Sequence, residues 1–191
     1  MTYKLKLIIG STRPQRKGPI VARWFLDILE NHKHFEVEVL DLQEINLPLL
    51  DEPEHPRLQK YTHEHTKKWS KTINEADAYI VVTPEYNYGY PASLKNALDY
   101  LSVEWQEKPM AFVSYGGISA GTRAVQDLKL PVTTLGMMPL QQAVNIPFFT
   151  QFINEDGVFV GNETLEKSAN GMLNKLKVWT KALKAMREEA Q

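Results

Sequence analysis

Two nearly uninterrupted apolar stretches constrain the fold of this chain more than any other feature. Residues 78–82 read AYIVV, and residues 5–10 read LKLIIG with a single charge. A strand exposed on one face alternates apolar and polar residues, whereas a strand covered on both faces is apolar throughout. Fully covered strands are typical of parallel sheets with helices packed on both faces. The sequence therefore predicts an α/β protein.

Strand-like and helix-like segments alternate along the rest of the chain, which favours a doubly wound sheet. Strands are expected at residues 3–10, 34–42, 77–83, 109–115 and 138–144. Helices are expected at residues 19–31, 58–76, 91–102, 120–135 and 164–189, with Pro131 breaking or kinking the fourth. We therefore predict a flavodoxin-like three-layer fold, with five parallel strands in the order 2-1-3-4-5, as one domain over residues 1–191.

Composition and charge exclude several classes of function. The formal net charge is −1, so a broad nucleic-acid or acidic-membrane surface is not expected. The absence of cysteine excludes disulfides, thiolate metal sites and a cysteine nucleophile. His63 and His65 are expected on different faces of a helix, so no metal site is predicted. The N-terminal apolar run is too short for a membrane span or a signal peptide, and a cytoplasmic protein is expected.

The loop after the first strand, GSTRPQR at residues 10–16, combines groups that bind phosphate. Gly10 permits a tight turn, and hydroxyl and guanidinium groups precede an expected helix start. A basic, solvated turn is the alternative. Gln15 stands where a Walker motif needs its second glycine, and Thr12 stands where a dinucleotide motif needs one, so neither motif is present.

The loop after the third strand, TPEYNYGYP at residues 83–91, suits a flat ligand with polar edges. Asn87 and free backbone N–H groups can bond such an edge, and a tyrosine can lie against the ring. Alternatively, the tyrosines cap the core. Glu85 has no matched partner for acid–base catalysis, and a rim or helix-pairing role is favoured over it. After the fourth strand, Gly116 and Gly117 allow close approach to a planar ligand, although this segment also fits a plain strand-to-helix turn.

Together, GSTRPQR, TPEYNYGYPASLKNALDYL and SYGGISAGTRA resemble the NADPH-dependent FMN reductase family, which includes azoreductases, quinone reductases and chromate reductases. The resemblance implies that the FMN phosphate is held by Ser11, Arg13 and Arg16. It implies that the isoalloxazine and ribityl groups are wrapped by Pro84, Glu85, Tyr86 and Asn87. It implies that the other side of the ring is lined by Ser114, Tyr115, Gly116 and Gly117. Many relatives carry a small hydroxyl residue where this chain has Lys17-Gly18.

The resemblance implies hydride transfer from NADPH or NADH through bound FMN to a small-molecule acceptor such as a quinone, an azo compound or free flavin. No catalytic side chain is required, because the cofactor carries the chemistry. A homodimer or homotetramer is expected. An electron carrier or regulatory module without turnover is the main alternative, disfavoured by the loop arginines and the near-neutral charge. A phosphate-handling hydrolase is disfavoured because the chain lacks a cysteine and an aspartate cluster after the first strand.

Overall fold

The computed structural model describes residues 2–189, and its centre is a five-stranded parallel sheet. The strands are β1 (Tyr3–Ile9), β2 (Phe35–Asp41), β3 (Ala78–Pro84), β4 (Pro109–Tyr115) and β5 (Met138–Ile146). Their order is β2-β1-β3-β4-β5, with Leu5 in register with Val37 on one side and with Ala78 on the other. This order confirms the predicted flavodoxin-like topology.

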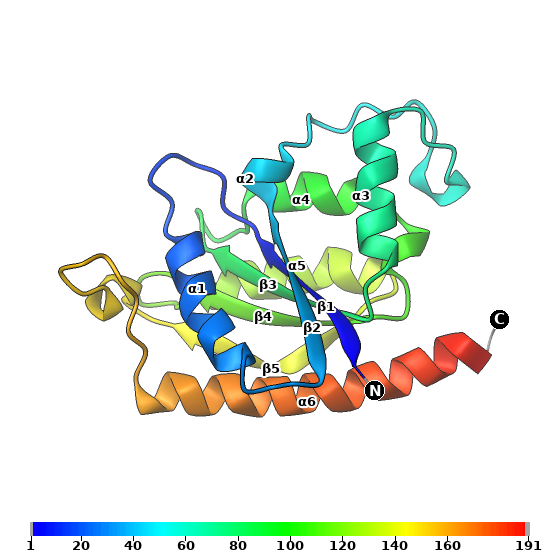
Figure 1. Cartoon of the computed structure of the whole chain (residues 1–191). Helices are drawn as coiled ribbons and strands as arrows, with labels where there is room; N and C mark the ends of the chain where they lie inside the picture. Colours follow the sequence, from blue (N-terminus) through cyan, green and yellow to red (C-terminus); the bar gives the residue numbers. More distant parts are fainter. Residues whose placement is uncertain (1, 190–191) are drawn as a thin grey trace.

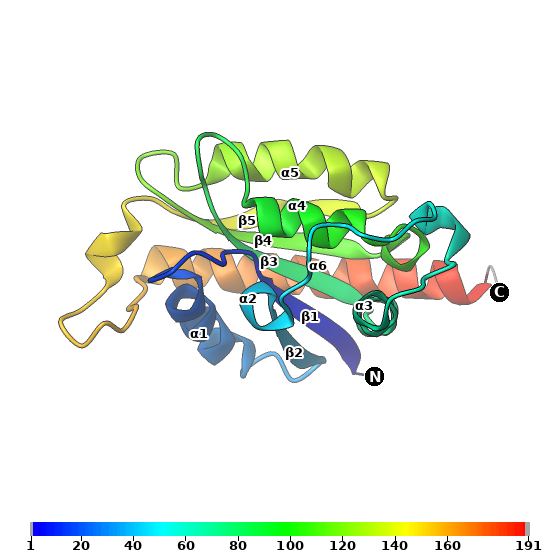
Figure 2. The ribbon, with the colours of Figure 1, turned by 90° about the horizontal axis from the view of Figure 1, so that it is seen from above.

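Helices cover both faces of the sheet, as Figures 1 and 2 show. The helices are α1 (Gly18–Leu29), α2 (Leu42–Ile45), α3 (Glu64–Asn74), α4 (Ala92–Asp99), α5 (Thr122–Thr134) and α6 (Glu163–Glu189). Helices α1 and α6 pack on one face around Phe25 and Leu176. The other three long helices pack on the opposite face around Trp69 and Leu98. The sheet therefore lies between two separate apolar layers.

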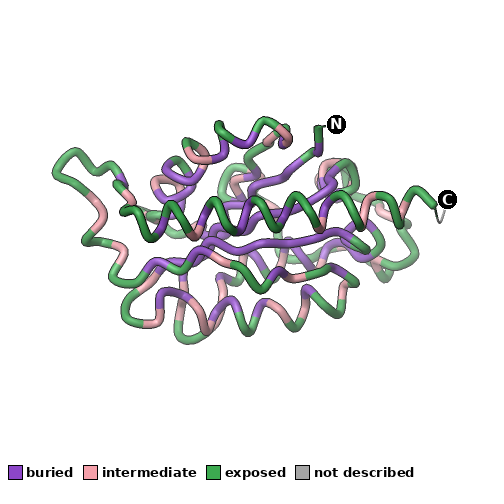
Figure 3. Tube along the Cα trace, turned by 90° about the horizontal axis from the view of Figure 1, so that it is seen from below, coloured by how far each residue is buried: buried purple, intermediate pink, exposed green. Residues whose placement is uncertain are grey.

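The central strands are buried over their whole length, and this explains their apolar sequences. All seven residues of β3 and all seven of β4 are buried. In Figure 3 the strands run as a buried band beneath α6, whose outer turns are exposed. Edge strand β2 differs, because Glu36 and Glu38 are exposed along it. Charges on an edge strand oppose pairing with other chains.

The segment before β3 contains less helix than the predicted range 58–76. A 3-10 turn, η1 (Pro56–Leu58), ends at Gln59, which has a φ of 51°, and α3 begins only at Glu64. The Glu52 carboxylate accepts hydrogen bonds from the backbone N–H groups of Thr62 and His63, at 2.8 and 3.0 Å. These bonds hold the irregular segment against the start of α3 and lower the pKa of Glu52 to about 2, despite an opposing contribution from burial.

The histidine prediction was wrong in its geometry. His63 precedes α3 with extended backbone, so its ring stacks on that of His65, with centroids 5.2 Å apart. Both rings lie near Asp51, and His65 Nε2 is 3.0 Å from an Asp51 carboxylate oxygen. Within residues 2–189, no group of three or more histidine, aspartate or glutamate side chains has the arrangement needed to hold a metal ion.

Two further helical details refine the prediction. Helix α5 continues through Pro131 to Thr134, and the Leu135 N–H bonds to the Pro131 carbonyl. The helix expected at 91–102 is shorter, because α4 ends at Asp99, and a separate 3-10 turn, η2 (Val103–Trp105), follows the expected range. A third 3-10 turn, η3 (Phe149–Phe152), follows β5. Across residues 2–189, no helix combines the length and apolar character needed for a membrane crossing.

Candidate functional site

A cleft of about 240 Å³ opens where the loops after β1, β3 and β4 meet. These strands are neighbours in the sheet, so their carboxyl ends bring the three loops to the same edge (Figure 1). The cleft is lined by Arg13, Lys17, Pro84, Glu85, Tyr86, Tyr115, Gly116, Gly117 and Phe149. These three loops, joined by Phe149 from the segment after β5, therefore form one candidate site.

The loop after β1 divides its basic side chains between the cleft and the protein. Arg13 and Lys17 are exposed and line the cleft. Within residues 2–189, neither makes an ion pair or a side-chain hydrogen bond, so both charges are available to an anion. Arg16 instead forms a two-pronged ion pair with Asp41, with both contacts at 2.5 Å. It also donates to the Ser11 carbonyl at 2.8 Å.

Ser11 is fully buried beneath the start of α1. The Tyr115 hydroxyl donates to Ser11 Oγ at 3.4 Å, which connects this loop to the end of β4. A Cβ atom at Gly18 would lie 2.5 Å from Ser11 Oγ, so only glycine fits at that position in this packing. The Lys17-Gly18 pair thus gives the loop a cleft-facing cation followed by a close contact between helix and loop.

The loop after β3 is a tight turn rather than an open loop. Tyr86 and Gly89 exchange backbone hydrogen bonds of 2.9 and 3.0 Å. Asn87 and Tyr88 occupy the turn with φ values of 49° and 75°, the backbone of a two-residue hairpin turn. Asn87 is exposed at the tip and does not line the cleft, whereas Tyr86 does.

The Glu85 carboxylate is bound by side chains at the start of helix α5. Its carboxylate accepts hydrogen bonds from the Ser119 hydroxyl at 3.0 Å and from Arg123 Nε at 2.6 Å. Burial raises the pKa of Glu85, but these hydrogen bonds outweigh it and hold the pKa below its usual value. The Arg123 guanidinium also lies 3.8 Å from the ring centroid of Tyr88, a cation–π contact. Glu85 is therefore an ionised anchor for the turn, and it lacks the raised pKa of a proton donor.

The loop after β4 presents backbone to the cleft. Gly117 is exposed, and a Cβ atom there would meet no atom within 4 Å. The N–H groups of Phe148 and Phe149 bond to the carbonyls of Gly117 and Gly116, at 3.1 and 3.2 Å. Ser114 is fully buried, and its Oγ lies 2.8 Å from the Ala120 carbonyl oxygen. Ser114 thus braces the loop from behind.

Aromatic packing closes the floor of the cleft. The rings of Tyr115 and Phe149 meet edge to face, with centroids 5.0 Å apart. Burial raises the pKa of the Tyr115 hydroxyl to about 12, so it stays protonated at neutral pH. Tyr115 therefore acts here as a packed wall and a hydrogen-bond donor to Ser11.

The structure brings most of the sequence-predicted site residues together. Seven of them line the cleft: Arg13, Pro84, Glu85, Tyr86, Tyr115, Gly116 and Gly117. Four do not: Ser11 and Ser114 are buried, Arg16 is paired with Asp41, and Asn87 is at the turn tip. Two lining residues were absent from the predicted set. Lys17 could have been found from its charge beside the loop, whereas Phe149 arrives from after β5 without a motif.

The sheet order and this cleft define the class of protein. It is a flavodoxin-like α/β protein with available cations after β1 and a glycine-lined wall after β4. The model of the NADPH-dependent FMN reductase family matches residues 3–151, most of the chain. The chain belongs to this family, and it is an oxidoreductase that depends on FMN and NAD(P)H.

Named relatives agree with this assignment. An NAD(P)H-dependent FMN reductase of Schizosaccharomyces pombe is 41% identical over 152 residues, covering 78% of this chain and 74% of the relative. One from Saccharomyces cerevisiae is 36% identical over 165 residues, covering 80% and 86%. Among solved structures, the flavoenzyme FerB of Paracoccus denitrificans has a TM-score of 0.69 at 21% identity, covering 96% of this chain and 98% of FerB. That likeness shows the shared fold.

The residues present in the cleft fit FMN. A phosphate needs cations and free N–H groups. The cleft offers the cations Arg13 and Lys17. The start of α1 offers backbone N–H groups, because no side chain at the N-cap residue Lys17 binds them. A flat ring needs a wall without side chains, and Gly117 leaves that space open. The two requirements are met on opposite loops of the same cleft.

Proposed function

We propose that this chain transfers hydride equivalents from NADPH or NADH through bound FMN to small oxidised acceptors such as quinones, azo compounds or free flavin. The observation that carries the proposal is the cleft, where the cations of the first loop and the glycine wall of the third loop face one space. An NADPH azoreductase of a Bacillus strain is 34% identical over 127 residues, which supports azo compounds among the acceptors.

The two-electron chemistry is supplied by FMN when it is bound. The protein's part is to bind and orient. Arg13 and Lys17 would hold the phosphate, and the backbone of residues 84–86 and of Gly116 and Gly117 would hold the ring. Glu85 would position the second loop through its bonds to α5 and would transfer no proton. A homo-oligomeric state and a cytoplasmic location stay predictions.

An anaerobic titration tests this function. We expect the purified protein to retain FMN and be yellow, to be bleached by NADPH, and to regain its colour on addition of a quinone. Steady-state oxidation of NADPH with a quinone or an azo dye should clearly exceed the rate with free FMN at the same concentration. A colourless protein without affinity for FMN would contradict the proposal. A rate equal to the free-FMN background would support the electron-carrier alternative instead.

A further inference from the structure

We propose that Asp41 is a positioning residue for the FMN phosphate, acting through Arg16 rather than touching the cofactor. The inference rests on the proposed function and adds to it a division of labour among the basic residues of the first loop. Arg13 and Lys17 would contact the phosphate. Arg16 and Asp41 would hold the loop in the shape that presents them.

The geometry of the pair carries this inference. Each terminal nitrogen of Arg16 lies 2.5 Å from one oxygen of Asp41, and one of these nitrogens also donates to the Ser11 carbonyl at 2.8 Å. Both side chains are only 11% exposed. A planar guanidinium bound in this way by a carboxylate has a fixed orientation and a neutralised charge. Arg16 therefore offers little free charge to a phosphate.

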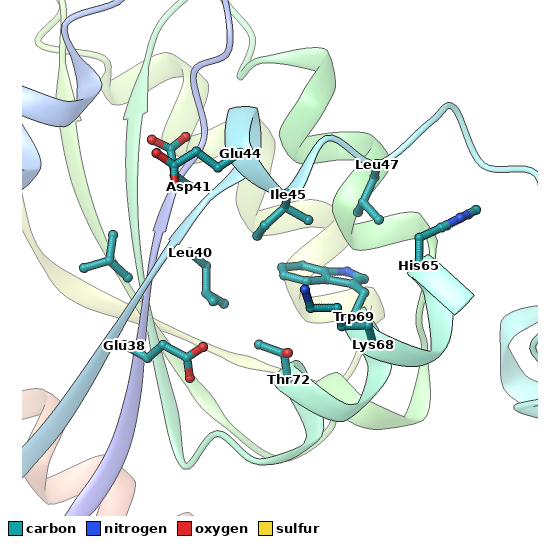
Figure 4. Close-up of a pocket in the computed structure, with 11 residues that line it drawn as sticks. Glu38, Leu40, Asp41, Glu44, Ile45, Leu47, His65, Lys68, Trp69 and Thr72 are labelled. Carbon is teal, nitrogen blue, oxygen red and sulfur yellow. The ribbon is translucent and has the colours of Figure 1, made fainter. Parts of the chain in front are cut away.

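Asp41 occupies the point where three elements meet. It is the last residue of β2, in register with Ile9 at the end of β1. Its carboxylate also accepts a hydrogen bond from the Gln43 N–H at 3.0 Å, which caps α2. Figure 4 shows Asp41 beside Glu44 where β2 meets α2. The carboxylate thus connects the sheet edge and α2 to the phosphate loop.

The pair also explains how the loop keeps its shape before a ligand arrives. Segment 10–17 has few backbone hydrogen bonds, among them Gly10 N–H to the Val82 carbonyl and Arg16 N–H to the Arg13 carbonyl. The Arg16 side chain adds a bond across the loop to Ser11. Removing the charge of Asp41 would free Arg16 and loosen this bond, so FMN binding would have to order the loop at a cost in affinity.

The test compares two flavins that differ only in the phosphate. In Asp41→Asn we expect the Kd for FMN to rise roughly tenfold, by analogy with the lower end of the loss when an outer partner of a metal ligand is removed. The Kd for riboflavin, which has the ring and ribityl chain without phosphate, should change by less than about twofold. Amides of residues 11–18 in the apoprotein should exchange hydrogen faster. Arg16→Lys, which keeps the charge but loses the two-pronged geometry, should show the same pattern.

Asp27→Asn is the matched control, because Asp27 pairs with Arg23 on α1 at 3.4 Å with both side chains well exposed. It should leave both flavin affinities and loop exchange unchanged. The inference fails if Asp41→Asn leaves FMN affinity unchanged or tightens it, or if it weakens both flavins equally. If Asp41→Asn does not fold, Arg16→Lys decides by the same criteria. If the wild type binds no FMN, the proposed function fails. The comparison of amide hydrogen exchange between wild type and Asp41→Asn still tests whether the Arg16–Asp41 pair holds the loop.

Discussion

Arg13 and Arg16 lie three residues apart in one loop, yet they meet different surroundings. Arg13 is exposed at the cleft, where its full charge is available. Arg16 is enclosed between Asp41 and the Ser11 carbonyl. The same residue type therefore serves as a candidate ligand contact in one place and as a structural support in the other.

Arg13→Ala should weaken FMN binding by about 1.5–3 kcal/mol, because one set of hydrogen bonds from a charged donor is lost. Riboflavin binding should be unaffected. Isothermal titration of the apoprotein with each flavin measures the difference, and Arg23→Ala on the outer face of α1 is the control. Unchanged FMN affinity in Arg13→Ala would remove this residue from the phosphate site.

Glu85→Gln should lower the Tm at neutral pH by roughly 3–6 °C, since charged hydrogen bonds to Arg123 and Ser119 are lost. The pKa of Glu85 is lowered in the folded state, so its contribution is present above the usual carboxylate pKa of 4.5. That contribution is lost as the pH falls through the lower folded-state value. The Tm gap between wild type and variant should therefore close on acidification.

Melting curves from neutral to acidic pH measure this gap. Asp99→Asn, which breaks the exposed pair with Lys95 on α4, should change the Tm little at any pH. A gap for Glu85→Gln that is constant with pH would mean that Glu85 is not an ionised anchor.

The position of a single residue could be anticipated where it depends on local sequence, and could not where a distant partner decides it. The motifs placed Arg16 near the site, but its partner Asp41 is 25 residues away on another strand. Ser114 follows the same logic, since its hydroxyl faces Ala120 and Asn145 instead of the cleft. The stacking of His63 on His65 depended on where α3 begins, which is set by Glu52.

Among the elements, the loop between β4 and α5 shows how two nearby glycines differ. Gly121 has a φ of 78°, and a Cβ atom there would lie 2.9 Å from Ser114 Cβ and 3.0 Å from the Tyr115 nitrogen. At Gly117 the added atom would meet nothing within 4 Å. One glycine is required by the packing, while the other keeps a surface open.

Gly121→Ala should destabilise the protein by about 1–3 kcal/mol, from the left-handed backbone and the close contacts together. Gly117→Ala should leave stability within about 0.5 kcal/mol of the wild type but weaken FMN binding, because the methyl group would stand on the open wall. Urea unfolding and flavin titration on both variants separate the two effects. Equal stability losses in both would show that the loop responds to any side chain.

Helix α6 contains a glycine that costs stability. Gly171 is exposed in the helix interior, and a Cβ atom there would meet no atom within 4 Å, so Gly171→Ala should stabilise by about 0.5–1 kcal/mol. Gly157 has equal space but a φ of 76°, so Gly157→Ala should destabilise. Thermal unfolding of both variants checks the opposite signs. A loss of stability in Gly171→Ala would contradict the exposure of this face.

Element types were predictable because the apolar pattern changes clearly between strands and helices, and β4 matches its expected range of 109–115. Ends were less predictable. Pro131 does not stop α5, because its missing N–H removes only one backbone hydrogen bond of the helix. The helix then ends at Thr134. The helix expected at 58–76 was too long, because Gln59 has a left-handed backbone conformation that no helix continues through. Helix α3 begins only at Glu64.

At the scale of the whole molecule, the sheet order was predictable from the number of β/α units and the covered central strands. That order alone implied that the loops after β1, β3 and β4 would meet. The arrival of Phe149 at the same cleft was not predictable, because its position depends on bonds between the segment after β5 and the glycines after β4.

The pairing of β1 with β3 has a further consequence for how fast the molecule gains and loses its structure. Leu5 on β1 aligns with Ala78 on β3, so the loops after these two strands, which form two walls of the cleft, become neighbours only after the long segment between the strands has been enclosed. A ligand that needs both walls has nothing to bind earlier. Added FMN should therefore slow unfolding in stopped-flow experiments while leaving the refolding rate almost unchanged, so that the cofactor extends the lifetime of the native protein.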